Sequence, residues 1–121
     1  MFKLTATIGT AMCAGLFLLC FFVPTTFVML YGASADAGAA FMGRRASVLF
    51  LGLAVIFWLA RNAEKSALRD AICFGAAVAF GGAALTGFWS YFSGTSGPQM
   101  ILSALGEAGL AALFFLSTRR P

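Results

Sequence analysis

One carboxylate, Glu107, stands inside a long apolar stretch, residues 99 to 117. A charged carboxylate deep in a membrane-spanning helix costs about 2.5 to 3.5 kcal/mol on insertion scales, so such a residue usually faces the interior of a helix bundle and finds a partner there. The residues four positions to either side of it, Ser103 and Ala111, are small, as suits a face in contact with another helix. We therefore expect Glu107 to point into the protein.

Two arginines and two hydroxyl groups are the candidate partners of this carboxylate. At a helical rise of about 1.5 Å per residue, Arg44 and Arg45 fall at a membrane depth similar to that of Glu107, as do Ser103 and Thr86. We expect an intramembrane polar cluster in which Glu107 pairs with Arg44 or Arg45, with Ser103 and Thr86 as hydrogen-bond partners. The cluster could fix helix register, bind a ligand or couple to a proton, or contact another subunit.

The elements that position these groups follow from the composition. Of 121 residues, 61% are hydrophobic and 10% charged, which is too little polar surface for a globular domain in water. Segments of membrane-spanning length, about 20 residues or more, lie at 4–31, 39–60, 67–92 and 99–117. Because the connections are short, we predict a single all-α domain, residues 1–121: an integral membrane up-down-up-down bundle of four transmembrane helices.

Cations predict the orientation. Lys and Arg accumulate on the cytoplasmic side of membrane proteins. With both termini cytoplasmic, the cations on that side are Lys3, Arg61, Lys65, Arg69, Arg119 and Arg120, against Arg44 and Arg45 on the other. We expect a multi-pass protein of the bacterial cytoplasmic (inner) membrane with both termini inside.

Small residues form a row in the third segment at every fourth position: Ala71, Gly75, Ala79, Ala83 and Gly87. Small side chains let helices approach closely, and packing of this kind drives helix association in lipid. The row predicts a packing face inside the bundle, with this helix at its centre, or else a homodimer surface. In the first segment, Pro24 predicts a bend, because proline removes a backbone donor.

Several residue types needed for chemistry are missing. The chain has no His, and its three Cys residues form no close metal-ligand motif. It has neither a serine nucleophile motif nor a glycine-rich phosphate loop, and Glu107 is its only deep carboxylate. We expect no enzyme activity, no cofactor and no bound metal. The net charge of +4 is spread around the apolar segments, so we expect no nucleic-acid partner either.

Three stretches carry a resemblance to a known family: "FMGRRASVLFLGLAVIFWLAR", "LRDAICFGAAVAFGGAALTGF" and "ILSALGEAGLAALFFL". Over residues 40 to 117 the chain resembles an uncharacterised bacterial family of small four-helix integral membrane proteins, a domain of unknown function. The resemblance implies the fold, and it implies that Arg44 or Arg45, Arg69 and Glu107 are the family positions. It implies no activity.

These patterns predict a non-catalytic inner-membrane protein, an accessory or scaffold subunit that binds another membrane protein or a lipid. The expected partners are membrane lipid and either a membrane-protein partner or further copies of the chain. The alternative is a small carboxylate-dependent, proton-coupled transporter acting as a homodimer. In size the chain is similar to the small multidrug exporters, but their essential Glu lies in the first helix, which has no acidic residue here.

Overall fold

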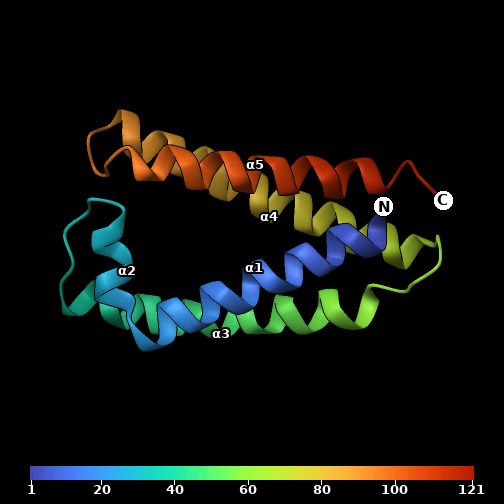
Figure 1. The fold of residues 1–121 in the computed structure, drawn as a ribbon, viewed down its shortest axis with the longest axis horizontal. Coiled ribbons are helices and arrows are strands. Elements are labelled where there is room, and N and C mark those ends of the chain that lie inside the picture. The colour runs from blue at the N-terminus through green and yellow to red at the C-terminus, as the bar shows by residue number, and fades with distance from the viewer.

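The computed structural model describes residues 1–121 and consists of helices and their connections. The helices are α1 (Phe2–Phe22), α2 (Pro24–Leu30), α3 (Ala37–Ala60), α4 (Ala67–Phe92) and α5 (Gln99–Ser117) (Figure 1). Four of them, all except α2, are long and apolar enough to cross a membrane. The predicted all-α bundle with four spans is confirmed, and the chain is a multi-pass membrane protein.

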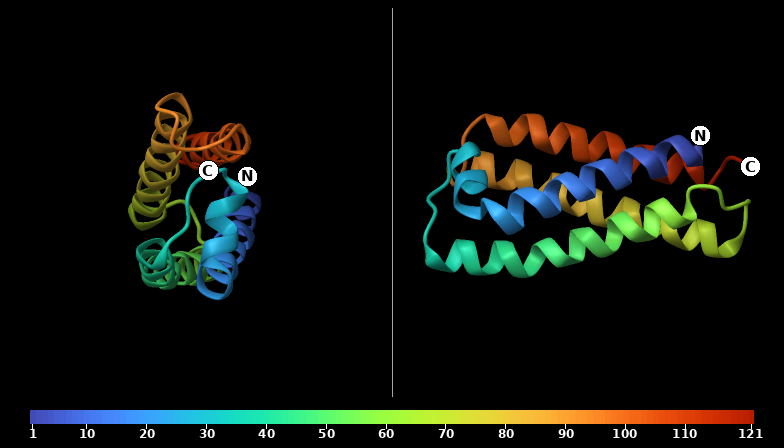
Figure 2. Two further views of the ribbon diagram at one scale, coloured as in Figure 1. Left: turned by 90° about the vertical axis from the view of Figure 1, so that its left-hand side faces the viewer. Right: turned by 60° about the horizontal axis from the view of Figure 1, so that its bottom comes forward.

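The long helices run antiparallel, so the connections gather at two ends. Both chain termini and the 61–66 connection lie at one end, here called the terminal end; α2 and the connections 31–36 and 93–98 lie at the other, the loop end (Figures 1 and 2). Two helix starts carry side-chain caps. Asp36 accepts a hydrogen bond from the Ala39 N–H at 2.7 Å, and Ser66 accepts one from the Arg69 N–H at 3.1 Å.

The first apolar segment is broken, which corrects the prediction of one helix over residues 4–31. Val23 separates α1 from α2 with φ −132° and ψ 53°, and Pro24, which has no N–H, begins α2. Helix α3 passes close to the break at Gly43, where an added Cβ would lie 3.2 Å from the Cβ of Pro24. The break turns α2 across the loop end toward the connection between α4 and α5 (Figure 1).

The long helices associate as two pairs. Helix α1 packs along α3 and α4 packs along α5, while backbone contacts between the pairs are few and mainly join α1 to α5 (Figure 2). The prediction that the third membrane span, α4, is central is therefore wrong. Each pair is a hairpin of consecutive spans, and side chains make most of the contact between the pairs.

Aromatic rings join the pairs in the half nearer the terminal end. Phe57 of α3 and Phe114 of α5 are fully buried with ring centroids 4.9 Å apart, and Phe80 of α4 lies 6.2 Å from Phe114. Helix α1 reaches this cluster at Gly9, where an added Cβ would lie 3.0 Å from Phe57 and 3.1 Å from Phe114. Glycine at this position allows the close approach.

Arg69 ties the terminal end together. It is only 4% exposed, its Nη2 donates to the backbone oxygen of Arg120 at 2.6 Å, and its guanidinium lies 5.0 Å from the Phe2 ring. Nearby, Lys65 pairs with Asp70 at 2.6 Å and donates to the backbone oxygen of Thr118. Arg69 thus holds the C-terminal residues against α4.

Candidate functional site

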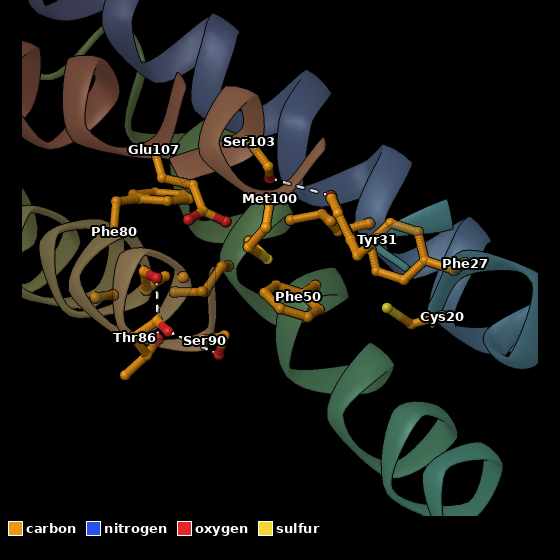
Figure 3. Close-up of a pocket in the computed structure, with 15 residues that line it drawn as sticks. Cys20, Phe27, Tyr31, Phe50, Phe80, Thr86, Ser90, Met100, Ser103 and Glu107 are labelled. Carbon is orange, nitrogen blue, oxygen red and sulfur yellow. Dashed lines mark hydrogen bonds between the residues drawn. The ribbon is translucent and has the colours of Figure 1, made fainter. Parts of the chain in front are cut away.

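A cavity of about 290 Å³ lies between the two helix pairs, on the loop-end side of the aromatic cluster. All five helices contribute to its lining, together with Tyr31 just after α2. The walls are mostly apolar, and the cavity is partly open to the molecular surface. Figure 3 shows Glu107 and Ser103 reaching into it from α5, opposite Thr86 and Ser90 of α4.

The side chains of α4 explain why the pairs stand apart here. Phe80 closes the cavity toward the terminal end, whereas its neighbour Ala79 and, on the following turns, Ala83 and Thr86 are too small to span the space. Phe27 of α2 and Phe50 of α3 line the opposite side (Figure 3). The cavity therefore lies beside a stretch of α4, residues 81–87, that has no ring-sized side chain.

The small-residue row is not the packing face that the sequence predicts. Four residues advance an α-helix about 40° beyond a full turn, so a row at every fourth position winds around the helix. Ala71 and Gly75 are exposed, Ala79 and Ala83 line the cavity, and only Gly87 is buried. The buried face of α4 follows the helical period instead, through Arg69, Cys73, Ala76, Phe80, Ala84 and Gly87.

Gly87 makes the kind of close contact expected of the row. A Cβ at this position would lie 2.9 Å from the Met100 Cε and 3.2 Å from the Ala104 Cβ. Both neighbours belong to α5, so Gly87 brings α4 and α5 together beside the cavity. The close approach is within one helix pair and not between the pairs.

Glu107 points inward, as predicted. Its Oε2 is buried and has no hydrogen-bond partner, and its carboxylate forms no salt bridge. The only ion pair in the chain, Lys65 with Asp70, lies at the terminal end. The cavity therefore contains one acidic group with no partner from the protein.

The predicted pairing of Glu107 with an arginine does not form. Arg44 and Arg45 are exposed and line a hollow on α3 that is separate from the cavity. The Arg44 Nε donates to the backbone oxygen of Phe21 at 3.3 Å, and the Arg45 guanidinium lies 5.8 Å from the Phe41 ring. Helix breaks leave carbonyls without their usual donors, which is costly in lipid. Arg44 therefore supplies a hydrogen-bond donor to a carbonyl at the helix break before Pro24.

The predicted hydroxyl partners reach the cavity but do not bond to Glu107. Ser103 accepts a hydrogen bond from the Tyr31 hydroxyl at 3.1 Å. Thr86 donates to the Ala83 backbone oxygen at 2.9 Å, and Ser90 donates to that of Thr86 at 2.9 Å. Of the predicted cluster, the structure brings together Glu107, Ser103 and Thr86 around one cavity and leaves out Arg44 and Arg45.

Tyr31 is a lining residue that the sequence analysis does not single out. Besides its hydroxyl bond to Ser103, its backbone oxygen accepts from the Gly97 N–H at 2.6 Å. Gly32 follows with φ 73°, and a Cβ there would lie 2.9 Å from the Gly97 nitrogen. Helix α2 thus covers the loop end of the cavity and joins the pairs. The signal in the sequence was Pro24, which allows the chain to turn.

The acidic and sulfur-containing side chains are dispersed over the chain. The chain has no group of three or more His, Cys, Asp or Glu residues that could hold a metal ion. Its cysteines, Cys13, Cys20 and Cys73, are unbridged and buried. No family model, curated protein or solved structure matches the chain. Fold and site together define a small multi-pass helical bundle with an internal cavity that carries one unpaired carboxylate.

Proposed function

We propose that this protein is a non-catalytic accessory or scaffold subunit of the bacterial cytoplasmic membrane that binds a lipid or another amphipathic molecule between its helix pairs. The observation that carries the proposal is the cavity of about 290 Å³. Sites of this kind are concave and mostly apolar, with a few polar groups that orient the ligand. The lining of this cavity, apolar walls with Glu107 and a few hydroxyl groups, fits that description.

The lining also supports a non-catalytic role. A hydroxyl nucleophile needs a base within hydrogen-bond reach. Glu107 is the only acidic residue in the lining, which has no His or Lys, and no hydrogen bond joins Glu107 to Ser103 or Thr86. The hydroxyl of Thr86 instead donates to its own helix. These contacts suit orienting a bound molecule better than activating one.

We also propose the orientation with both termini in the cytoplasm. The terminal end gathers Lys3, Arg61 and Arg69 around one hollow, and the tail and the connection to α4 add Arg119, Arg120 and Lys65. This accumulation is typical of a cytoplasmic face. The cavity would then lie in the outer half of the membrane. Cysteine introduced at exposed Ser34, in a chain without native cysteines, should react with an impermeant thiol reagent from outside the cell.

Filling the cavity tests the proposed function. Native mass spectrometry of protein purified in mild detergent should detect a retained amphipathic molecule, and Ala83→Phe should remove it, because Ala83 lines the cavity. Leu85→Phe is the matched control on the same helix, since Leu85 is 71% exposed. Equal retention by both variants and the original protein would show that the cavity is not the binding site.

A carboxylate-dependent transporter is the second candidate, and the unpartnered oxygen of Glu107 favours it. Intramembrane acidic groups recur in proton and substrate pathways. A bundle this small would work as a homodimer, so the candidate requires a dimer in lipid and a flux that depends on Glu107. Proteoliposomes that show proton or substrate flux, abolished by Glu107→Gln, would favour transport over the accessory role.

A further inference from the structure

We infer that the cavity selects a cationic amphiphile: a molecule with an alkylated ammonium group, which lies beside Glu107, and an apolar body that occupies the aromatic part of the cavity. The inference rests on the proposed function, because it names the chemical class of the molecule that the cavity binds. Three independent properties of the lining support it: its charge, its hydrogen-bonding capacity and its aromatic content.

The charge of the lining is unbalanced. Glu107 is the only residue among the lining side chains that is charged in its usual state, and no Lys, Arg or His accompanies it. Its Oε2 is buried without a partner, and no salt bridge reaches the carboxylate. Buried charges are costly unless they are paired. A positive charge on the ligand would supply the partner that neither Arg44 nor Arg45 provides.

The hydrogen-bonding capacity of the lining favours a donor or a cation over an anion. Three of its four hydroxyl groups already donate within the protein: Tyr31 to Ser103, Thr86 to Ala83 and Ser90 to Thr86. Only the Ser103 hydroxyl has no acceptor among the hydrogen bonds of the structure. A phosphate or sulfonate needs several donors, and this cavity offers one. The oxygens of Glu107, Thr86 and Ser90 can all still accept.

The aromatic side chains favour an alkylated ammonium over a small hydrated cation. Phe27, Tyr31, Phe50 and Phe80 all line the cavity, and Figure 3 places the first three toward one end with Phe80 near Glu107. Aromatic faces attract ammonium groups. Phe80 is placed to contact the ammonium beside Glu107, and the other three rings suit the apolar body. Apolar walls cannot replace the oxygen ligands that Mg²⁺ or Ca²⁺ requires.

The size of the cavity limits the part of the ligand that enters. At about 290 Å³ it lies near the lower bound of small-molecule pockets, roughly 300 Å³. It therefore holds a headgroup with a short chain or one ring. A longer chain would leave through the open side of the cavity.

A matched pair of probes tests the inference. Tritiated n-octyltrimethylammonium is equilibrated with the protein in nonionic detergent by dialysis, with empty micelles as the blank. Competitors are its uncharged isostere, in which carbon replaces nitrogen, and n-octyl sulfonate. We expect saturable binding of the cation, with competition by the isostere weaker by at least roughly tenfold and none by the sulfonate. Equal competition by the isostere would overturn the inference.

Variants test whether Glu107 causes the preference for the cation. Glu107→Gln, nearly the same shape without the charge, should weaken binding of the cation by at least roughly thirtyfold and leave binding of a tritiated isostere unchanged. Glu64→Gln is the matched control, because Glu64 is exposed in the 61–66 connection. Unchanged cation binding by a folded Glu107→Gln protein would overturn the inference. The comparison of probes on the unmodified protein decides the question even where this variant fails to fold.

The inference and the proposed function fail differently in these measurements. If cation and isostere bind equally and Ala83→Phe abolishes both, the cavity binds amphipathic molecules without selecting charge, so the inference fails and the proposed function stands. If Ala83→Phe leaves binding of both probes unchanged, the cavity is not the binding site and both fail.

Discussion

The two halves of the bundle are built from the same helix pairs and differ in what fills the space between them. Toward the terminal end, Phe57, Phe80 and Phe114 fill that space, and Gly9 lets α1 pack against them. Toward the loop end, Ala79, Ala83 and Thr86 leave a cavity of about 290 Å³.

This difference shows that overall hydrophobicity does not decide where a membrane bundle is closed. Both halves are apolar, and lipid offers little hydrophobic drive for helices to associate, so contact depends on side chains that fit together. In the half nearer the terminal end, the rings of Phe57 and Phe114 pack against Gly9 and bring the pairs into contact. Small side chains of α4 along a wider space, with α2 covering the end, leave a cavity in the other. We assign stability to the first half and binding to the second, and the following variants test that division.

The largest loss of stability is expected from Phe114→Ala. Phe114 is fully buried and packs against both Phe57 and Phe80. Truncating a buried Phe to Ala costs about 3 to 5 kcal/mol. Thermal unfolding followed by circular dichroism in detergent measures the effect. The matched control is the neighbouring Phe115→Ala, because Phe115 is 42% exposed; equal losses from the two variants would contradict the division.

A smaller loss is expected from Gly9→Leu, which inserts a side chain where a Cβ alone would already lie 3.0 Å from Phe57. Overpacking of this kind costs about 1 to 3 kcal/mol. Gly15→Leu on the same helix is the control, because no atom lies within 4 Å of a Cβ there. The same unfolding measurement should leave the Gly15 variant near the original stability, and a fully tolerated Gly9→Leu would mean that the pairs are not closed at this point.

Tyr31→Phe should have a modest effect at the loop end. It removes the 3.1 Å hydrogen bond to Ser103 and keeps the ring and the backbone bond to Gly97. A hydrogen bond of this type contributes about 0.5 to 1.5 kcal/mol. Hydrogen exchange of residues 24–31 should increase while exchange around Phe114 stays the same. Equal increases at both places would show that the two halves open together.

The smallest effect on stability is expected from Glu107→Gln. Because no arginine pairs with Glu107, the substitution leaves no buried cation behind, and removing a charge from an apolar segment favours membrane insertion. The free energy of unfolding should change by less than about 1 kcal/mol, whereas breaking a buried ion pair costs roughly 3 to 5 kcal/mol. A loss of that larger size would indicate that Glu107 pairs with an arginine, as the sequence suggested.

Features set by length and composition could be predicted from the sequence. The three later spans match α3, α4 and α5 within two residues, because apolar length and capping residues such as Asp36 and Ser66 are local signals. The inward direction of Glu107 was also predictable, since a carboxylate is costly against lipid.

Features that depend on rotation around a helix axis could not be predicted. The rise per residue gives the depth of Arg44 and Arg45 but not the side of α3 on which they lie. The small-residue row is not a packing face inside the bundle for a related reason, because a row at every fourth position winds around the helix. The alternative, a homodimer surface, stays a prediction. The position of Tyr31 depended on how far the chain turns at Pro24, which one proline does not specify.

The pairing of α1 with α3 and of α4 with α5 bears on how the chain is made. Each pair consists of consecutive spans, so a ribosome delivers the first hairpin complete before α4 is synthesised. Contacts between residues near in sequence form with little loss of chain entropy. The first hairpin can therefore assemble in the membrane during translation, and the Phe57, Phe80 and Phe114 cluster forms only when the second hairpin arrives. If the chain is divided after Asn62, each fragment retains a whole hairpin. Co-expression of the two fragments should then reassemble the bundle.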